Sequence, residues 1–314
     1  SRIPNRQTLM NPIVEVSGFI LLIILGQVLR RLEILTPECS KAVSTLVLNV
    51  TLPCAVLRAL NGVELTASLL VLVLLGLLAN VFTFLQMAFT ERRHAEDPDG
   101  LTKRFSQLVM PGYNVGTFAM PFTAGFLSPE GFLALCLFDA GNAVMCTGGT
   151  YAVLFRESGS LLKQFASIVK RLLSSFAILT YLIVAALSVT HTRIPDVILH
   201  IIDIPANANT FLAMIMIGMS VNLNIRLESL KRLLRLLGLR YLGSVLMGAF
   251  VYWCLPFSED VRLGILLVLF APLPAMGIIF SMKGRMNWQL AANLNTMSVL
   301  CSVVIMSALL SLLV

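Results

Sequence analysis

Apolar stretches long enough to cross a lipid bilayer follow one another along almost the whole chain, and this pattern constrains the fold most. A helix needs about 20 apolar residues to cross the hydrocarbon core. Only 12% of the 314 residues are charged, whereas roughly 25% is usual in a soluble domain. Because so little charge cannot cover an aqueous surface, the bilayer must be the solvent. The sequence therefore predicts an all-α membrane protein.

Ten transmembrane spans account for the apolar stretches. Numbered in chain order, they are residues 13–29, 42–57, 65–90, 107–127, 131–155, 172–190, 208–225, 236–255, 261–282 and 288–314. The connections are short, so no separate soluble domain is expected. Two halves of five spans each, residues 1–155 and 172–314, are joined by a short cytoplasmic linker at 156–171.

The distribution of Lys and Arg supports this count. If the N-terminus lies outside, 18 of the 23 Lys and Arg residues fall on the cytoplasmic side, which is the asymmetry that the positive-inside rule describes. Both termini are then outside, in a plasma membrane or a bacterial inner membrane. The net charge of +7 is thus a topology signal, and no nucleic-acid partner is expected. The lipid bilayer is the predicted partner of the apolar surface.

Each half has an odd number of spans, five, so two similar halves would insert in opposite orientations. A 5+5 inverted repeat is therefore predicted. Such repeats are typical of secondary transporters, whose sites lie near the midplane at interrupted helices. Proline removes a backbone donor, and glycine tolerates an unwound backbone. These residues cluster at matching positions, namely Pro111, Gly112, Gly116 and Pro121 in span 4 and Pro272, Pro274 and Gly277 in span 9. Spans 4 and 9 are therefore predicted to be broken helices.

At these positions the sequence resembles the auxin efflux carrier family of membrane transporters. The resemblance rests on the segment Leu48–Pro53, on Asn114 followed seven residues later by Pro121, on the segment Ile217–Ser220, and on the prolines of span 9. It covers nearly the whole chain in span order and loop length. It implies the ten-span fold of bile-acid sodium symporters, with spans 1, 2, 6 and 7 as a scaffold and spans 3–5 and 8–10 as a mobile transport domain. Spans 4 and 9 would then be broken crossover helices that cross at their midpoints.

The resemblance also implies a secondary active transporter that moves a small organic anion by alternating access. The short linker favours the compact microbial type, for which dicarboxylates such as malate or malonate are expected rather than auxin. Two alternatives stay open, a sodium symporter of the bile-acid type and a membrane anion sensor that does not transport. A second copy of the chain, docked through the scaffold spans as a homodimer, is a further open partner.

Polar side chains and helix breaks inside the spans give the candidate substrate site. No Lys or Arg is expected deep in a span, so an anion would be held by amides and by the N-termini of half-helices. Each polar residue can instead satisfy a freed backbone group, and both interpretations stay open. The predicted substrate-binding residues are Asn49, Thr51, Asn114, Pro121, Pro272, Pro274 and Asn293.

Asp139 lies about eight residues into span 5, and acidic residues inside a span are functional hypotheses by default. Asn142 follows at i+3 and shares its helix face, so Asp139 and Asn142 are the candidate ion-coupling pair. The alternative is a protonated Asp139 in a structural hydrogen bond. Span 9 has no acidic residue to join a sodium site, so a proton is favoured over sodium as the coupling ion.

Catalysis finds no support in the sequence. No HExxH, GxSxG or P-loop motif is present, so an enzyme is not expected. The six Cys residues form no CxxC pair and no cluster with His at metal-ligand spacing, so neither a metal site nor a bound cofactor is predicted.

Overall fold

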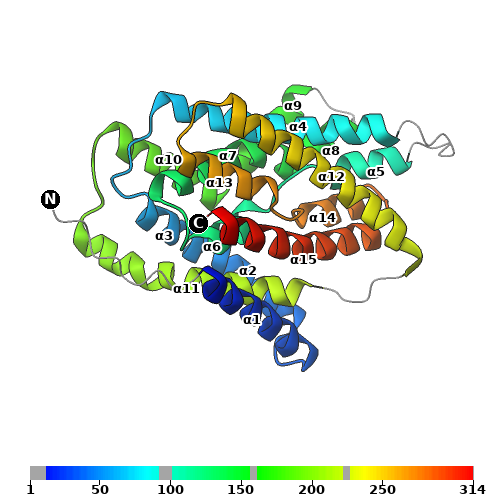
Figure 1. The fold of residues 1–314 in the computed structure, drawn as a ribbon, viewed down its shortest axis with the longest axis horizontal. Helices are drawn as coiled ribbons and strands as arrows, with labels where there is room; N and C mark the ends of the chain where they lie inside the picture. Colours follow the sequence, from blue (N-terminus) through cyan, green and yellow to red (C-terminus); the bar gives the residue numbers. More distant parts are fainter. Residues whose placement is uncertain (1–11, 92–100, 156–160, 222–226, 314) are drawn as a thin grey trace.

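The computed structural model describes residues 12–91, 101–155, 161–221 and 227–313, and every regular element in those ranges is a helix (Figure 1). The α-helices are α1 (Pro12–Arg31), α2 (Pro37–Leu46), α3 (Leu52–Ala59), α4 (Val71–Thr90), α5 (Leu101–Val109), α6 (Met120–Thr123), α7 (Pro129–Val144), α8 (Thr150–Leu154), α9 (Leu161–Leu173), α10 (Phe176–Val189), α11 (Asp196–Ser220), α12 (Leu227–Cys254), α13 (Glu259–Leu269), α14 (Met276–Lys283) and α15 (Trp288–Leu313). The start of the predicted first half, residues 156–160 of the linker and residues 222–225 of span 7 lie outside the described residues.

Six helical segments in the described ranges are long and apolar enough to cross a membrane. They are Pro37–Ala59, Ala67–Thr90, Pro129–Leu154, Asp196–Ser220, Leu230–Cys254 and Trp288–Leu313. The bent pair Ala166–Leu173 and Phe176–Val189, with an angle of 73°, gives up to seven. These segments confirm the prediction of an all-helical protein with several helices that can span a membrane.

Three further predicted spans, numbers 1, 4 and 9, do not correspond to a single uninterrupted helix of this length and apolar character. α1 has 20 residues but carries Glu15 near its start and Arg30 and Arg31 at its end. Predicted spans 4 and 9 each consist of shorter helical pieces on either side of an irregular segment. The number of uninterrupted apolar helices is therefore smaller than the number of apolar stretches in the sequence.

Prolines lie just after two of the π-helical turns. A π-helical turn, Val47–Thr51, joins α2 to α3 just before Pro53. A second one, η4 (Val115–Ala119), leads into α6 just before Pro121. Proline has no N–H to donate and its ring presses on the carbonyl four residues earlier, so the preceding turn widens. Such π turns inside helices are frequently found at functional sites.

Glycines allow pairs of helices to approach each other closely. A Cβ built on Gly26 of α1 would lie 2.4 Å from the Ile215 carbonyl oxygen of α11, and one on Gly218 would lie 2.1 Å from that of Ile23. In the same way, Gly76 of α4 and Gly141 of α7 face backbone of the opposite helix. Small residues at helix contacts are typical of proteins that pack within lipid.

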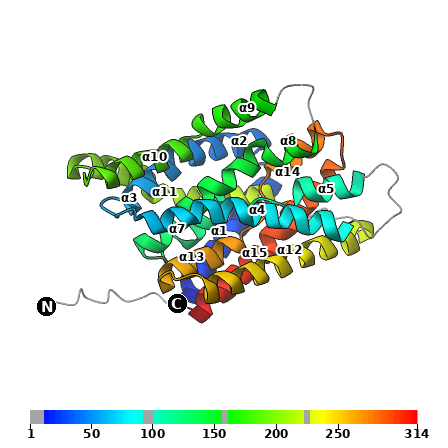
Figure 2. The ribbon, with the colours of Figure 1, turned by 90° about the horizontal axis from the view of Figure 1, so that it is seen from above.

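The helices pack into two groups. α1, α2, α3 and α11 pack on one another, and α10 packs on α3. The second group consists of α4, α5, α7, α12, α13, α14 and α15. In Figure 1, α1 and α11 lie along the lower edge, α4 lies along the upper edge, and α12 runs obliquely from the right-hand side up to it. Figure 2 shows α10 and α12 at opposite edges. Large apolar side chains such as Leu21, Leu85 and Val304 are exposed on the outer surface, where lipid would cover them.

Candidate functional site

The irregular segments of the two interrupted spans meet at one point. α5 ends at Val109, and helical structure resumes at Val115. α13 ends at Leu269, and α14 begins at Met276. The backbone N–H of Asn114 in the first break donates to the carbonyl of Pro272 in the second, with an N–O distance of 2.9 Å. The two breaks that the proline and glycine clusters predict therefore touch each other, and we call this point of contact the crossing.

Gly112 makes the close approach at the crossing possible. Its φ is +100°, a conformation that residues with a Cβ rarely adopt. A Cβ at this position would lie 2.7 Å from Cγ of Pro274 and 2.9 Å from the sulfur of Cys146. A glycine is thus required both by the backbone conformation and by the space that is left.

Polar side chains of α7 and α15 bind the freed backbone of the two breaks. Asn142 of α7 accepts from the N–H of Tyr113 at 3.0 Å and donates to its carbonyl at 2.9 Å. In α15, Asn295 donates to the carbonyl of Leu273 at 2.6 Å, and the hydroxyl of Ser298 accepts from the N–H of Leu273 at 3.0 Å. Each break is therefore held at a central residue by a helix that lies further along the chain, the first break by α7 and the second by α15.

Arg240 of α12 is a crossing residue that the sequence analysis missed. It is 1% exposed and lies near the middle of the membrane-length segment Leu230–Cys254. The expectation that no Lys or Arg lies deep in a span is therefore wrong, and the number of basic residues assigned to the cytoplasmic side falls from 18 to 17. The signal was present, because predicted span 8 starts at residue 236. The basic run before it led to a loop assignment.

A cavity of about 630 Å³ opens beside the crossing. Four predicted site residues line it, namely Asn114, Asp139, Asn142 and Pro274. Two cations, Arg171 and Lys283, line it as well, together with hydroxyl groups of Thr117, Thr147 and Ser175. Asn114 uses its side-chain oxygen to accept from Thr117 at 2.5 Å. Its amide nitrogen has no hydrogen-bond partner within the described ranges, so it is available to an occupant of the cavity.

The Asp139 carboxylate connects the two helix groups. One oxygen accepts from Asn142 at 3.0 Å within α7, and the other accepts from the hydroxyl of Tyr181 in α10 at 2.8 Å. In the part of the chain that the structure describes, no Lys or Arg lies within 4.0 Å of this carboxylate. An acid with hydrogen-bond donors but no cationic partner can exchange a proton without breaking an ion pair.

The other predicted substrate residues do not line this cavity. Pro272 lies at the crossing through its carbonyl. Thr51 is buried and donates to Asn209 of α11 at 2.9 Å, so it joins two helices. Pro121 and Asn293 are buried in α6 and α15, and Asn49 is exposed. The structure thus brings together the crossing residues and the coupling pair but leaves these four elsewhere.

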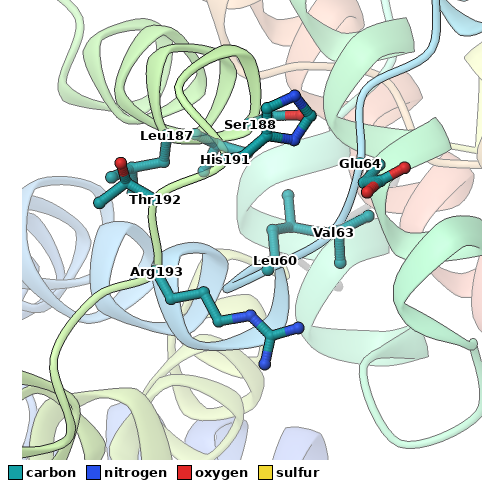
Figure 3. Close-up of a pocket in the computed structure, with 10 residues that line it drawn as sticks. Leu60, Val63, Glu64, Leu187, Ser188, His191, Thr192 and Arg193 are labelled. Carbon is teal, nitrogen blue, oxygen red and sulfur yellow. The ribbon is translucent and has the colours of Figure 1, made fainter.

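A second cavity, of about 270 Å³, is lined by α3 and α11 on one side and by α6 and α7 on the other. Arg58 lines it and forms an ion pair with Asp203 at 3.7 Å. A third cavity, of about 110 Å³, lies between the ends of α3 and α10. Figure 3 shows Glu64, Ser188 and His191 around it. None of the predicted site residues lines this third cavity.

Neither protein-family models nor curated proteins give a match to this chain. The resemblance to the auxin efflux carrier family therefore rests on the residues and motifs themselves. Function must be argued from the crossing and the cavities.

Proposed function

We propose that this chain is a secondary active transporter that moves a small organic anion across a membrane by alternating access. The observation that carries the proposal is the crossing, where two interrupted helices touch beside a cavity with cations and a free amide. Backbone that is not helical is tolerated at membrane depth only where it is buried or lines a cavity. Substrate sites of secondary transporters are typically built at such interruptions.

The proposal interprets the helices as ten spans, five in each half. The spans would be α1, α2–α3, α4, α5–α6, α7–α8, α10, α11, α12, α13–α14 and α15. A matched pair of contacts supports the inverted repeat. Tyr113 in the first break is bound by α7, and Leu273 in the second is bound by α15. In this numbering the two supporting helices are spans 5 and 10, which occupy equivalent places in the two halves.

Two cavities on one boundary support alternating access. The cavity beside the crossing lies between the turn Val47–Thr51, α3 and α10 of the first helix group and α7 and α14 of the second. The cavity at Arg58 lies between α3 and α11 of the first group and α6 and α7. In the proposed topology Arg171 and Lys283 are cytoplasmic and Arg58 is outside, so the cavities are the inner and outer approaches to one site. The first group would be the scaffold and the second the transport domain.

An organic anion is the substrate class that the cavity lining favours. Arg171 and Lys283 supply positive charge, and the amide of Asn114 supplies a hydrogen-bond donor close to the crossing. Carboxylates accept hydrogen bonds of this kind, which are stronger than those between neutral groups. The family resemblance points to the same class, and within it to dicarboxylates such as malate or malonate.

Asp139 is the proposed coupling residue, with a proton as the coupling ion. Its bond to Tyr181 crosses the boundary between the two helix groups. The carboxyl group also lines the cavity beside the crossing, so movement of one group against the other would change the side of the membrane from which a proton reaches it, and would break this bond as well. Protonation and domain position would then depend on each other, which is what an ion-coupled carrier requires.

Cysteine accessibility tests the proposal. Thr147→Cys reports the cavity beside the crossing and Ala124→Cys reports the outer cavity, each in protein whose own cysteines are replaced. Malonate should change the rate of labelling by a membrane-impermeant maleimide in opposite directions at the two positions. Thr192→Cys, in the third cavity, is the control and should not respond. Alternating access would be contradicted if the labelling rate changed in the same direction at both positions, or if no carboxylate tested changed it at either position.

A further inference from the structure

Arg240 is the one fully buried cation in the described ranges. Its guanidinium donates to the carbonyls of Met110, Gly112 and Ala271, at 2.7 Å for Gly112 and 3.2 Å for Ala271. The guanidinium carbon also lies 4.5 Å from the centre of the Tyr113 ring. No carboxylate of the described residues lies within 4.0 Å of it. A buried charge without an opposite charge is costly, so the surrounding carbonyls must stabilise it.

The three carbonyls share a position in the fold. Met110 and Gly112 follow the C-terminal end of α5, and Ala271 follows the C-terminal end of α13. Helix C-termini carry partial negative charge and carbonyls without a helical partner. The crossing brings two such ends together inside the protein. In transporters with broken helices, unwound carbonyls and half-helix C-termini of this kind coordinate Na⁺ or a proton.

We propose that Arg240 is the resident cation of the crossing and takes the place that a bound metal cation would otherwise fill. Arginine stays protonated in proteins, so this charge is permanent. It holds both breaks at once, because Gly112 belongs to the first and Ala271 to the second. Arg240 is thus a positioning residue for the neighbouring Asn114 and Pro274.

Given the proposed transport function, the place of Arg240 limits which ion can drive transport. If the carbonyls of the crossing are already occupied by a guanidinium, they are not available to a coupling cation. The carrier then needs no Na⁺ at this point, and Asp139 is left as the residue that responds to an ion gradient. The two roles are separated in space, since Arg240 binds the broken backbone and Asp139 faces the cavity.

Thermal unfolding of the purified protein in lipid nanodiscs tests the role of Arg240 without a substrate. Arg240→Lys keeps the charge, and Arg240→Gln keeps hydrogen-bond donors without it. Arg240→Gln should lower the melting temperature by about 8 °C and Arg240→Lys by about half as much, because three buried carbonyls lose their cation. Arg240→Gln as stable as Arg240→Lys would overturn the proposal, because charge would then not be what the carbonyls need.

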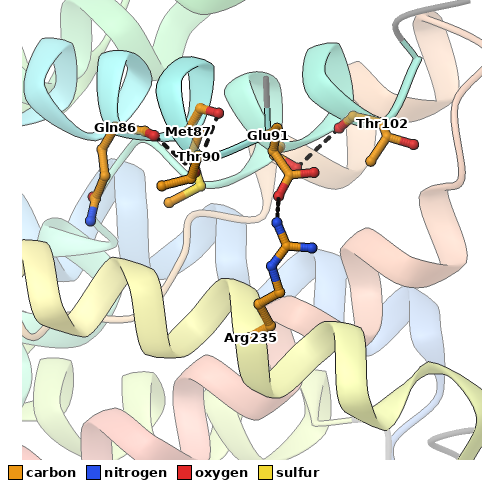
Figure 4. Close-up of polar contacts among 7 residues, drawn as sticks. Gln86, Met87, Thr90, Glu91, Thr102 and Arg235 are labelled. Carbon is orange, nitrogen blue, oxygen red and sulfur yellow. Dashed lines mark hydrogen bonds and ion pairs between the residues drawn. The ribbon is translucent and has the colours of Figure 1, made fainter. Parts of the chain in front are cut away.

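Arg235→Gln is the matched control in the same helix. Arg235 pairs with Glu91 at 2.6 Å, as Figure 4 shows, and it lies outside the crossing. The side chain of Arg235 is 39% exposed but that of Glu91 is only 2% exposed, so Glu91→Gln is combined with Arg235→Gln to leave no buried carboxylate without its cation. This double variant should melt within about 3 °C of the wild type. A loss as large as that of Arg240→Gln would contradict a special role for the crossing.

Arg240→Ala with added guanidinium ion tests the site itself. At a concentration ten times its dissociation constant, guanidinium should raise the melting temperature of this variant by about 3 °C, and the shift should grow with the logarithm of the guanidinium concentration. Neither the wild type nor the double variant of Arg235→Gln with Glu91→Gln should respond. No difference between Arg240→Ala and the wild type would overturn the proposal. If Arg240→Ala does not fold, the comparison of Arg240→Lys with Arg240→Gln decides. These results do not depend on transport, so the two proposals can fail separately.

Discussion

Replacing Asp139 with Asn separates proton coupling from structure at the candidate site. The carboxylate accepts from Asn142 and from Tyr181. An Asn at this position can still accept from Asn142 through its carbonyl, and it can donate to the oxygen of Tyr181. Each bond changes from charge-assisted to neutral, which costs about 1 kcal/mol per bond. Folding and substrate exchange should therefore survive, while proton binding at this position is lost.

The expected effect follows from the energy in a pH gradient. One pH unit across the membrane supplies about 1.4 kcal/mol per proton, which is a tenfold ratio of substrate concentrations. If one proton moves with each substrate and the membrane potential is held at zero, the wild type should accumulate a labelled carboxylate about tenfold. Asp139→Asn should equilibrate it to a ratio of about one, since no proton moves with the substrate.

Proteoliposomes provide the assay, with uptake against an imposed pH gradient and exchange between equal concentrations measured in parallel. Tyr181→Phe is the control, because it removes the bond across the helix boundary but keeps the carboxyl group. It should change the rate of uptake by less than about tenfold and leave the final tenfold ratio unchanged. Accumulation by Asp139→Asn with normal pH dependence would refute the reasoning and make Asp139 a structural residue.

Two further substitutions test the crossing. Asn114→Ala should weaken binding of the transported carboxylate at least tenfold, about 1.4 kcal/mol, because it removes a hydrogen bond to a charged group. Asn49→Ala is the control, an equal truncation at an exposed position outside the cavity, and it should change the affinity for the carboxylate less than about twofold. If isothermal titration shows that the two variants lose the same affinity, Asn114 is not part of the site. Gly112→Ala should destabilise the protein by about 2 kcal/mol or more, because its Cβ would collide with Pro274 and Cys146. Gly238→Ala in α12, where a Cβ meets nothing within 4 Å, should be neutral or stabilising in the same thermal unfolding assay.

The helix breaks were the most predictable part of the site. Pro111, Gly112, Pro272 and Pro274 lie at the interruptions because proline and glycine change the backbone itself, and such effects can be located in a sequence. That the two breaks touch through Asn114 and Pro272 is a tertiary contact. Only the resemblance to the auxin efflux carrier family suggested that the two breaks meet.

Two features were not predictable in the same way. The polar residues of a span bind either a substrate or backbone, and sequence alone does not separate these roles. Asn142, expected in ion coupling, holds Tyr113 as well as Asp139, while Thr51 pairs with Asn209 of a distant helix. Arg240 was assigned to a loop because Lys231, Arg232 and Arg235 precede it, although its buried carbonyl partners come from segments about 30 and 130 residues away.

The number of spans is also a matter of packing. A helix that is broken, bent or charged at its ends has fewer uninterrupted apolar residues than are needed to span a membrane, as α1 and the α9–α10 pair illustrate. Partners in the folded protein compensate for the missing apolar length. Periodicity in the sequence does not report such partners.

The central claim is that the chain transports a small organic anion, and uptake by reconstituted protein tests it most directly. A panel of labelled carboxylates that includes malonate and malate is offered to proteoliposomes under an imposed proton gradient, a sodium gradient or neither. We expect at least one carboxylate to accumulate under the proton gradient, with competition by the unlabelled compound and no response to sodium. Uptake no faster than in protein-free liposomes, for every carboxylate and every gradient, would contradict the account.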